Sequence, residues 1–441
     1  MQTEKNIVSY TLEASEFSWE IKPGKRVTAW GFNQQVPGPV LRAKQGETLV
    51  VKVINNLPEA TMIHWHGIRL PANMDGTIEV QKPIAPGETF EYRFELPDAG
   101  TFWYHSHHNE TSQMEKGMYG GIVVESEIDP VVDRDRLLMI DDMKLTKRNE
   151  FKKHGCIGRW IERHDGREGD TNLVNGKEDA TLHLYAGQTE RWRIVNAASA
   201  RYFNLSLNGR PFQVIATDGG LLEYPRTVTE LLITPGERFD ILVGPFEEWE
   251  NFPMNSLPYN RVTMLRSKFR TYANIQVMEK KPTVAKIPSR LREIKSLTHK
   301  DATVNRHVKL SVEPGLKRGI DFTVNGELHH MDKPVLVGDL QVWEVSNTSL
   351  MDHPFHLHGF FFQVIEENGK APAYVAWKDT YNLAPKSKIK IAWMPDNRPG
   401  RWMYHCHILE HHAAGMMAHF DVVDPSLPLA DYSAHHTRCH V

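Results

Sequence analysis

Four His-x-His pairs occur along the chain, and they are His64-Trp65-His66, His105-Ser106-His107, His356-Leu357-His358 and His405-Cys406-His407. In an extended strand, side chains two residues apart share a face, and the residue between them points the other way. Imidazoles on one face can therefore bind metal together. In the last pair, Cys406 would face the opposite side and bind a second metal. The sequence thus predicts two metal sites, back to back and joined by a few covalent bonds, which suits electron transfer.

The cysteine has the neighbours that a copper site needs. His411 and Met416 follow Cys406, and His353 lies three residues before His356, so that in a strand it would face the side of Cys406. A thiolate, two imidazoles and a thioether are the ligand set of a blue-copper electron-transfer site. The eight histidines of the four pairs are too many for one copper ion and fit three. Their open coordination positions could bind dioxygen.

A repeated module must position these residues. It is marked by a glycine and, nine residues later, an asparagine that ends an apolar strand, and the three pairs are Gly46 and Asn55, Gly187 and Asn196, and Gly338 and Asn347. The residues between them alternate apolar and polar, and Pro-Gly turns bracket the strands. This pattern favours three all-β sandwiches in series over helical or βαβ schemes.

Only two of the three copies carry histidines. Nine and eleven residues beyond each asparagine, the outer copies have His64 with His66 and His356 with His358, whereas the middle copy has leucines. We therefore expect the metal cluster where the first module meets the third, with the second module as a copper-free bridge. The predicted domains are residues 1–128, 129–280 and 281–425, followed by a peripheral tail at 426–441.

Two connecting segments stand out by composition. The charged stretch 147–179 is interpreted as a long surface insertion in the second module. The Lys- and Pro-rich segment 279–306 is interpreted as the linker to the third module, with a short helix at 290–294.

The composition also limits partners and compartment. The chain has 441 residues and a formal net charge of -3 with interspersed signs, so neither nucleic acid nor a membrane surface is expected as a partner. The polar start lacks the apolar part of a signal peptide. We expect a cytoplasmic protein, or a periplasmic or secreted one if a signal was removed. Three cysteines exclude a disulfide framework, although Cys156 and Cys439 could form one bridge. A monomer suffices to bring the first module against the third.

The motifs HWHG, HSH, HPFHLHG and HCHILEH followed by Gly-Met resemble those of three-domain multicopper oxidases of the bacterial laccase-like group, from about residue 10 to 425. The resemblance implies three cupredoxin-like Greek-key domains and four copper ions, one of type 1, one of type 2 and two of type 3. It implies type 1 copper at His353, Cys406, His411 and Met416, type 2 copper at His64 and His356, and the type 3 pair at His66, His105, His107, His358, His405 and His407.

The resemblance also implies the reaction. Substrate electrons would enter singly at the type 1 site, pass through Cys406 to His405 and His407, and reduce dioxygen to two waters. Laccase-like oxidases accept phenols and aromatic amines through an exposed edge of a type 1 histidine, expected here at His411. Metallo-oxidases instead oxidise cuprous ions and usually carry methionine-rich segments, whereas the 16 methionines of this chain are scattered.

We therefore predict phenol oxidation, with a cuprous oxidase as the alternative. Two hypotheses are more distant. One is a copper nitrite reductase, which needs fewer histidines, and the other is a copper-free scaffold protein, which would have lost some of the ligand residues.

Two carboxylates are candidate catalytic residues. Asp75 follows the first motif where relatives usually carry an acid, and we predict that it assists proton delivery rather than serving only as a turn residue. Many bacterial relatives place a glutamate directly after the second type 1 histidine, where this chain has His412. We predict that Glu410 or a chain of waters substitutes for it.

Overall fold

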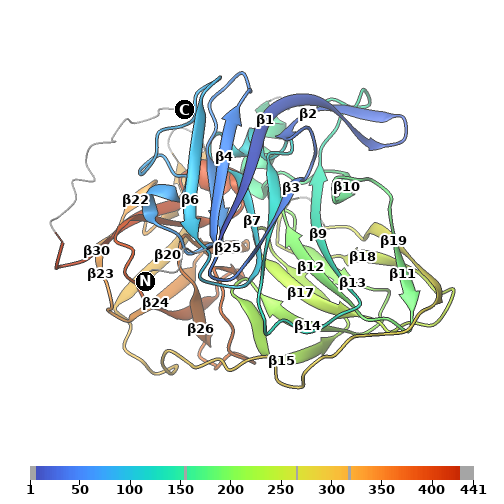
Figure 1. Ribbon diagram of the computed structural model, residues 1–441. Coiled ribbons are helices and arrows are strands. Elements are labelled where there is room, and N and C mark those ends of the chain that lie inside the picture. The colour runs from blue at the N-terminus through green and yellow to red at the C-terminus, as the bar shows by residue number, and fades with distance from the viewer. Residues whose placement is uncertain (1–5, 153–155, 265–266, 316–318, 428–441) are drawn as a thin grey trace.

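The computed structural model describes residues 6–152, 156–264, 267–315 and 319–427. Within these ranges strands dominate and form three sandwich modules of two sheets each, so the predicted all-β, cupredoxin-like fold is confirmed. Figure 1 shows the blue and cyan strands of the first module above the green second module and the orange and red third module. The domain boundaries at 128, 280 and 425 stay predictions.

The first module consists of two four-stranded sheets. One sheet has the order β2 (Lys25–Phe32), β1 (Ile7–Lys22), β4 (Thr48–Asn55), β6 (Thr89–Glu95), and the other β3 (Gly38–Lys44), β8 (Tyr119–Glu125), β7 (Gly100–Ser106), β5 (Ile63–His66). In β4, Leu49, Val51 and Val53 are buried while Lys52 points to solvent, as the alternating pattern predicts.

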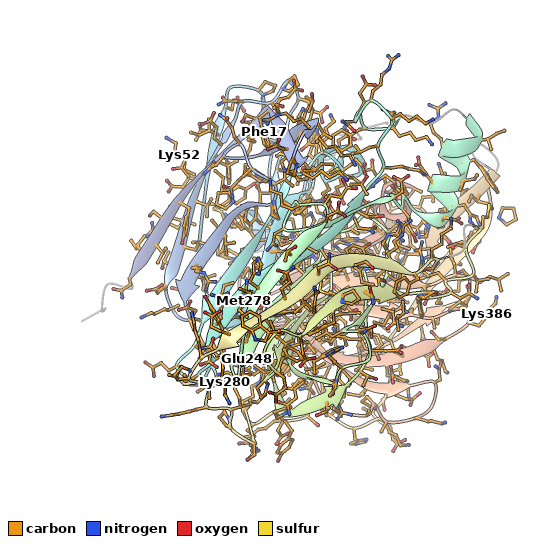
Figure 2. The ribbon with its side chains drawn as sticks, turned by 90° about the vertical axis from the view of Figure 1, so that its right-hand side faces the viewer. Phe17, Lys52, Glu248, Met278, Lys280 and Lys386 are labelled. Atoms are coloured by element: carbon orange, nitrogen blue, oxygen red, sulfur yellow. The ribbon has the colours of Figure 1, made fainter. Side chains whose placement is uncertain are left out.

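The second module carries larger sheets. The first sheet has the order β10 (Thr171–Val174), β9 (Arg134–Met143), β12 (Glu190–Asn196), β17 (Arg238–Val243), β14 (Phe212–Thr217), β15 (Gly220–Val228). The second has the order β11 (Ala180–Ala186), β19 (Arg270–Lys280), β18 (Asn251–Leu257), β13 (Phe203–Ser206), β16 (Leu231–Ile233). The charged side chains of the outer surface, such as Glu248 and Lys280, are of both signs (Figure 2).

The third module contains the strands with the second histidine set. One sheet has the order β21 (Gly319–Val324), β20 (Arg306–Gly315), β24 (Gln341–Asn347), β28 (Lys388–Trp393), β26 (Phe362–Glu367). The other has the order β22 (His330–Met331), β30 (Met417–Val423), β29 (Gly400–Cys406), β25 (His353–Leu357), β27 (Thr380–Leu383), with β23 (Val335–Leu336) beside β30. The helices of the described residues are short: η1 (Ala72–Met74), α1 (Glu110–Gln113), α2 (Cys156–Asp165) and α3 (Leu409–Ala413).

The repeated asparagine has the same structural role in each module. The side-chain amides of Asn55, Asn196 and Asn347 each donate to backbone carbonyls of two later segments, and each amide oxygen accepts from the backbone N–H two residues on. These bonds satisfy buried backbone groups where the central strand ends. The asparagine therefore fixes the loop that leads to the histidine strand in modules one and three.

The first and third modules meet, as predicted. Most of their buried apolar side chains belong to one continuous cluster, whereas most of the second module has its own. Phe102 of the first module stacks on Phe361 of the third, with ring centroids 6.4 Å apart. This shared core holds the two histidine sets against each other.

Two expectations about connecting segments need correction. Residues 281–305, all of them described, contain no helix, so the helix predicted at 290–294 is wrong. The N–H of Leu291 donates to the carbonyl of Glu223, and its side chain is buried, so packing against the second module keeps the linker extended. The stretch 147–179 is also not wholly a surface insertion, because Asp165 and Arg167 are buried.

The possible pairing of Cys156 with Cys439 and most of the tail, residues 428–441, lie outside the described residues. None of the helices in the described parts of the chain has the length and apolar character needed to span a bilayer.

Candidate metal centre

The eight histidines of the four pairs converge in one buried cluster at the junction of the first and third modules. They come from β5, β7, β25 and β29 and from the residues that directly follow these strands. Two stacked pairs join the modules, because His64 lies over His358 with ring centroids 3.9 Å apart, and His66 lies over His356 at 3.8 Å. Nε2 of His358 also lies 3.0 Å from Nε2 of His405.

The unused ring nitrogens of this cluster fit metal ions. Buried nitrogens without a hydrogen-bond partner among the described residues are Nε2 of His64, His105, His107 and His356, Nδ1 of His66 and both ring nitrogens of His407. Buried polar atoms normally have partners, so this concentration of unpaired lone pairs requires an explanation. Imidazole nitrogens converging in a buried cluster are suitable copper ligands.

The opposite ring nitrogens are held by the protein. Nδ1 of His64 bonds the carbonyl of Asp75 at 3.0 Å, and Nδ1 of His358 lies 2.9 Å from Oδ2 of the same residue. Nδ1 of His105 and Nδ1 of His356 bond backbone carbonyls. Such bonds orient a ligand imidazole and fix which nitrogen faces the metal.

A second, smaller group lies on the other side of β29. Sγ of Cys406 lies 3.5 Å from Nδ1 of His353 and 3.6 Å from Nδ1 of His411, and these two nitrogens are 3.2 Å apart. Met416 is buried beside them, and its carbonyl accepts a bond from the Cys406 N–H. A Cys-His-His group with an adjacent methionine has the composition of a blue-copper site.

Burial favours the uncharged form of each of these ligands. It lowers the pKa of His353 to about 3 and that of His107 to about 4, so both imidazoles are neutral near pH 7. It raises the pKa of the Cys406 thiol, so a bound cation would have to displace the thiol proton.

Asp75 lies beside the histidine cluster. The residue is buried, and its carboxylate is 3.3 Å from Nδ1 of His64 and 2.9 Å from Nδ1 of His358. One acidic residue thus contacts a histidine of each outer module. Its predicted part in proton delivery stays a prediction.

The structure does not bring Glu410 to the histidine cluster. Its buried carboxyl lies on the side of Arg167 and Gly166, and burial raises its pKa. On the side of His107, the carboxylate that contacts the cluster belongs to Glu110, at 2.9 Å from Nδ1 of His412 and 3.5 Å from Nδ1 of His107. Burial opposes ionisation of Glu110, yet His107 and His412 hold its pKa well below the usual range. Sequence reasoning missed Glu110, although it lies three residues after His107.

The expected exposed edge of His411 is wrong. The ring is fully buried, Nε2 donates to the carbonyl of His164 at 3.0 Å, and Phe322 stacks on it at 4.0 Å. The turn after α2 packs closely here because Gly166, at φ +78°, has no side chain. A Cβ at that position would lie 2.7 Å from Cγ2 of Ile408. The stretch that the sequence assigns to the surface therefore covers the small metal site.

Asp379 was also missed. Its Oδ1 lies 3.2 Å from Nε2 of His66, and its carbonyl accepts a bond from Nδ1 of His356 at 3.0 Å. Nothing in the segment Trp377-Lys378-Asp379-Thr380 resembles a ligand motif. Only the antiparallel pairing of His356 with Thr380 brings it to the cluster.

Three cupredoxin-like modules, a buried Cys-His-His group and an eight-histidine cluster between the outer modules define a copper oxidase of the multidomain type. Three family models, all described as multicopper oxidase, match residues 13–129, 141–282 and 290–426, and the chain belongs to the multicopper oxidase family. It is accordingly a copper-dependent oxidoreductase that uses one type 1, one type 2 and two type 3 copper ions.

The chain is 30% identical to multicopper oxidase mco of Staphylococcus aureus, over 94% of this chain and 88% of that protein. It is 28% identical to a laccase of Phlebia radiata, over 88% of this chain and 86% of the relative. A solved multicopper oxidase from Campylobacter jejuni, described as a metallo-oxidase, superposes with a TM-score of 0.84 and 31% identity, covering 96% of this chain and 92% of the other.

Proposed function

We propose that the chain takes single electrons from a reductant at the Cys406 site and uses them to reduce dioxygen to two waters at the histidine cluster. The observation that carries this proposal is the two-sided strand β29, which presents Cys406 to one site and His405 to the other. Bound copper would supply redox centres that store electrons until dioxygen can be reduced fully. The protein supplies the ligands, their orientation and the path between the sites.

The ligands are assigned by position. His353, Cys406, His411 and Met416 would hold type 1 copper, and His64 with His356 would hold type 2 copper. The type 3 pair would be held by His66, His105, His107, His358, His405 and His407. The unpaired nitrogens of His64, His66, His105, His107, His356 and His407 support this assignment, because each is buried within the cluster.

Electrons have two short routes from Cys406. The backbone joins Cys406 directly to His405 and His407, and Nδ1 of His405 donates a hydrogen bond to the Cys406 carbonyl at 2.8 Å. No side-chain movement is needed for either route.

Protons are needed as well, one for each electron delivered to dioxygen. Asp75 is the candidate donor on the side of His64 and His358, since its carboxylate contacts both rings. On the side of His107, the candidate donor is Glu110 together with His412, in the role that the sequence suggested for Glu410.

Phenols and aromatic amines remain the proposed donors, but they would dock on the α2 segment and not on His411 itself. Trp160 of α2 is 41% exposed and stacks on His164, with ring centroids 5.7 Å apart. The His164 carbonyl accepts a hydrogen bond from His411, so an aromatic electron donor stacked on Trp160 would have a short path to the type 1 site.

A cuprous donor is the second candidate, favoured by a different observation at the same place. Nδ1 of His164 lies 2.7 Å from Oδ1 of Asp165, and an imidazole paired with a carboxylate is a common metal ligand. A small ion also needs less exposed surface than a phenol. The description of the Campylobacter jejuni enzyme as a metallo-oxidase is consistent with this candidate.

Dioxygen consumption by copper-loaded protein tests both donors. We expect turnover of a dimethoxyphenol that falls several-fold in Trp160→Ala. Trp249→Ala, which removes another exposed tryptophan of the second module, is the matched control. A much higher efficiency with Cu(I) in the wild type would replace the phenol proposal with the cuprous one. Both parts of the histidine cluster come from one chain, which supports a monomer.

A further inference from the structure

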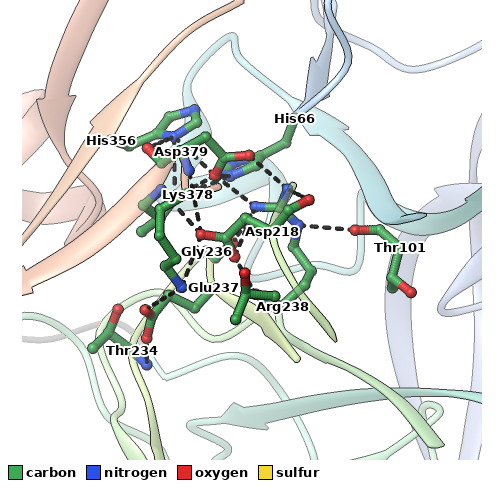
Figure 3. A network of polar contacts seen from close by, with 12 residues as sticks. His66, Thr101, Asp218, Thr234, Gly236, Glu237, Arg238, His356, Lys378 and Asp379 are labelled. Carbon is green, nitrogen blue, oxygen red and sulfur yellow. Dashed lines mark hydrogen bonds and ion pairs between the residues drawn. The ribbon is translucent and has the colours of Figure 1, made fainter. Parts of the chain in front are cut away.

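The second module, which carries leucine at the ligand positions, places a buried arginine beside the surroundings of the histidine cluster. Arg238 begins β17, is fully buried and faces Asp379 of the third module. Nη1 lies 2.6 Å from Oδ1 of Asp379, and Nη2 lies 2.6 Å from Oδ2, so the pair is bidentate. Figure 3 shows this pair beside His66 and His356.

Asp379 in turn contacts a histidine of each outer module. Oδ1 lies 3.2 Å from Nε2 of His66, and the backbone carbonyl of Asp379 bonds Nδ1 of His356. The hydroxyl of Thr380 lies within 3.2 Å of the same two nitrogens. Oδ1 of Asp379 also lies 3.6 Å from Nδ1 of His356, so rotation of this carboxylate would disturb both rings of the stacked pair.

The guanidinium has no freedom to rotate. All five of its N–H groups have acceptors: Nε donates to the carbonyl of Thr101, Nη1 to Gly236 and Asp379, and Nη2 to Asp218 and Asp379. These acceptors come from all three modules, because Thr101 belongs to β7 of the first module and Asp379 to the third. Arg238 is thus fixed by the whole assembly and not by its own module alone.

The surrounding backbone is shaped to admit this pair. A Cβ on Gly67, which follows His66 at φ +87°, would lie 2.8 Å from Oδ2 of Asp379. A Cβ on Gly236, beside Arg238, would lie 2.7 Å from Cδ2 of His407. The glycine of the HWHG motif therefore leaves room for the ion pair, and the second module packs directly on a cluster histidine.

A second ion cluster secures the residues next to this pair. Lys378 lies 3.0 Å from Oδ2 of Asp218 and 2.8 Å from Oε1 of Glu237. The backbone N–H of Arg238 donates to Asp218. Breaking a buried pair by removing one partner leaves an uncompensated charge, so this set is sensitive to substitution.

We propose that Arg238 of the copper-free module is a positioning residue for the histidine cluster: it locks Asp379, which orients His66 and His356. The second module is then part of the site and not only a bridge. The inference rests on the proposed ligand assignment, in which His356 holds type 2 copper and His66 belongs to the type 3 pair.

The test compares Arg238→Met and Arg238→Lys with Arg191→Met. Arg191 is a suitable control because it is also buried, lies in β12 next to β17, and pairs with Asp240 at 2.6 Å without contacting Asp379. The readouts are copper content, the blue type 1 absorption, the electron paramagnetic resonance signal of type 2 copper and dioxygen consumption.

We expect Arg238→Met to keep the blue absorption while copper affinity of the cluster or the dioxygen rate falls about 10- to 100-fold, with an altered type 2 signal. Arg238→Lys should restore part of that signal, since lysine keeps the charge but not the bidentate geometry. Arg191→Met should lower the unfolding temperature and leave the type 2 signal as in the wild type.

A wild-type type 2 signal and full copper content in Arg238→Met would overturn the inference. So would the same spectral change in Arg191→Met, because it would indicate general loosening of the second module. If Arg238→Met does not fold, Arg238→Lys decides by the same criterion: an altered type 2 signal supports the role, and an unaltered one contradicts it. Absence of any type 2 signal in the copper-loaded wild type would instead contradict the proposed function.

Discussion

Nδ1 of His405 donates a hydrogen bond to the backbone carbonyl of Cys406 at 2.8 Å, although the side chains of these neighbours face different sites. The Cys406 sulfur faces His353 and His411, while Nε2 of His405 lies 3.0 Å from Nε2 of His358. One peptide unit therefore joins the small site to the histidine cluster both through bonds and through a hydrogen bond. This relationship makes Cys406 the group through which the two sites are coupled.

Cys406→Ser should remove the blue absorption and the oxidase activity together, because a serine hydroxyl is not a thiolate ligand. The eight histidines do not depend on this side chain, so we expect the cluster to keep about three coppers per chain. Copper analysis and the visible spectrum of the same sample check this. An active Cys406→Ser enzyme would show that electrons bypass β29.

Asp75→Asn should leave reduction of the type 1 site unchanged and slow the reaction with dioxygen. The amide keeps the shape of the residue but cannot serve as a carboxylate between His64 and His358. We expect re-oxidation by dioxygen to slow about 10- to 100-fold in stopped-flow experiments that separate the two half-reactions. Asp98→Asn, at a partly exposed acid paired with Arg69, is the control. Equal rates of re-oxidation by dioxygen in the two variants would show that Asp75 serves only as a turn residue.

Glu110→Gln and Glu410→Gln distinguish the two carboxylates beside the last histidine motif. Glu110 contacts His412 and His107, whereas Glu410 lies on the side of Arg167. We expect Glu110→Gln to slow re-oxidation by dioxygen severalfold and Glu410→Gln to change it little. The reverse order would restore Glu410 as the proton donor that the sequence suggested.

Copper-free protein should lose stability on acidification below about pH 6.5. Burial lowers the pKa of His353 from 6.5 to about 3 and that of His107 from 6.5 to about 4. Between these values and 6.5 the unfolded chain binds more protons than the folded chain, so the free energy of unfolding falls as pH falls. Each such histidine contributes up to about 1.4 kcal/mol per pH unit.

Denaturant unfolding of the copper-free protein at several pH values between 7.5 and 5 measures this dependence. A free energy of unfolding that is constant over this range would contradict the burial of neutral imidazoles.

Sequence patterns of short range predicted the fold and most of the site. The alternation in β4 and the repeated asparagine are local features that reflect a half-buried strand and its end, so three sandwiches follow from them. The parity of His405 and Cys406 likewise depends only on strand geometry. Such features can be predicted from the sequence because residues close together in the chain produce them.

The residues that sequence missed act across the modules. Arg238 and Asp379 are 141 residues apart, and neither lies in a ligand motif. Glu110 depends on α1 meeting α3, where it contacts His412. The covering of His411 was missed because a charged segment is usually exposed, whereas here the turn after α2 is buried and Gly166 allows it to pack closely. Contacts of this kind arise only when the three modules assemble.

Anomalous X-ray scattering at the copper edge, from crystals of copper-loaded protein, tests the central claim most directly. We predict one peak among Cys406, His353 and His411 and three peaks among the eight clustered histidines. A junction between the first and third modules with no peak, or with a single one, would contradict the account.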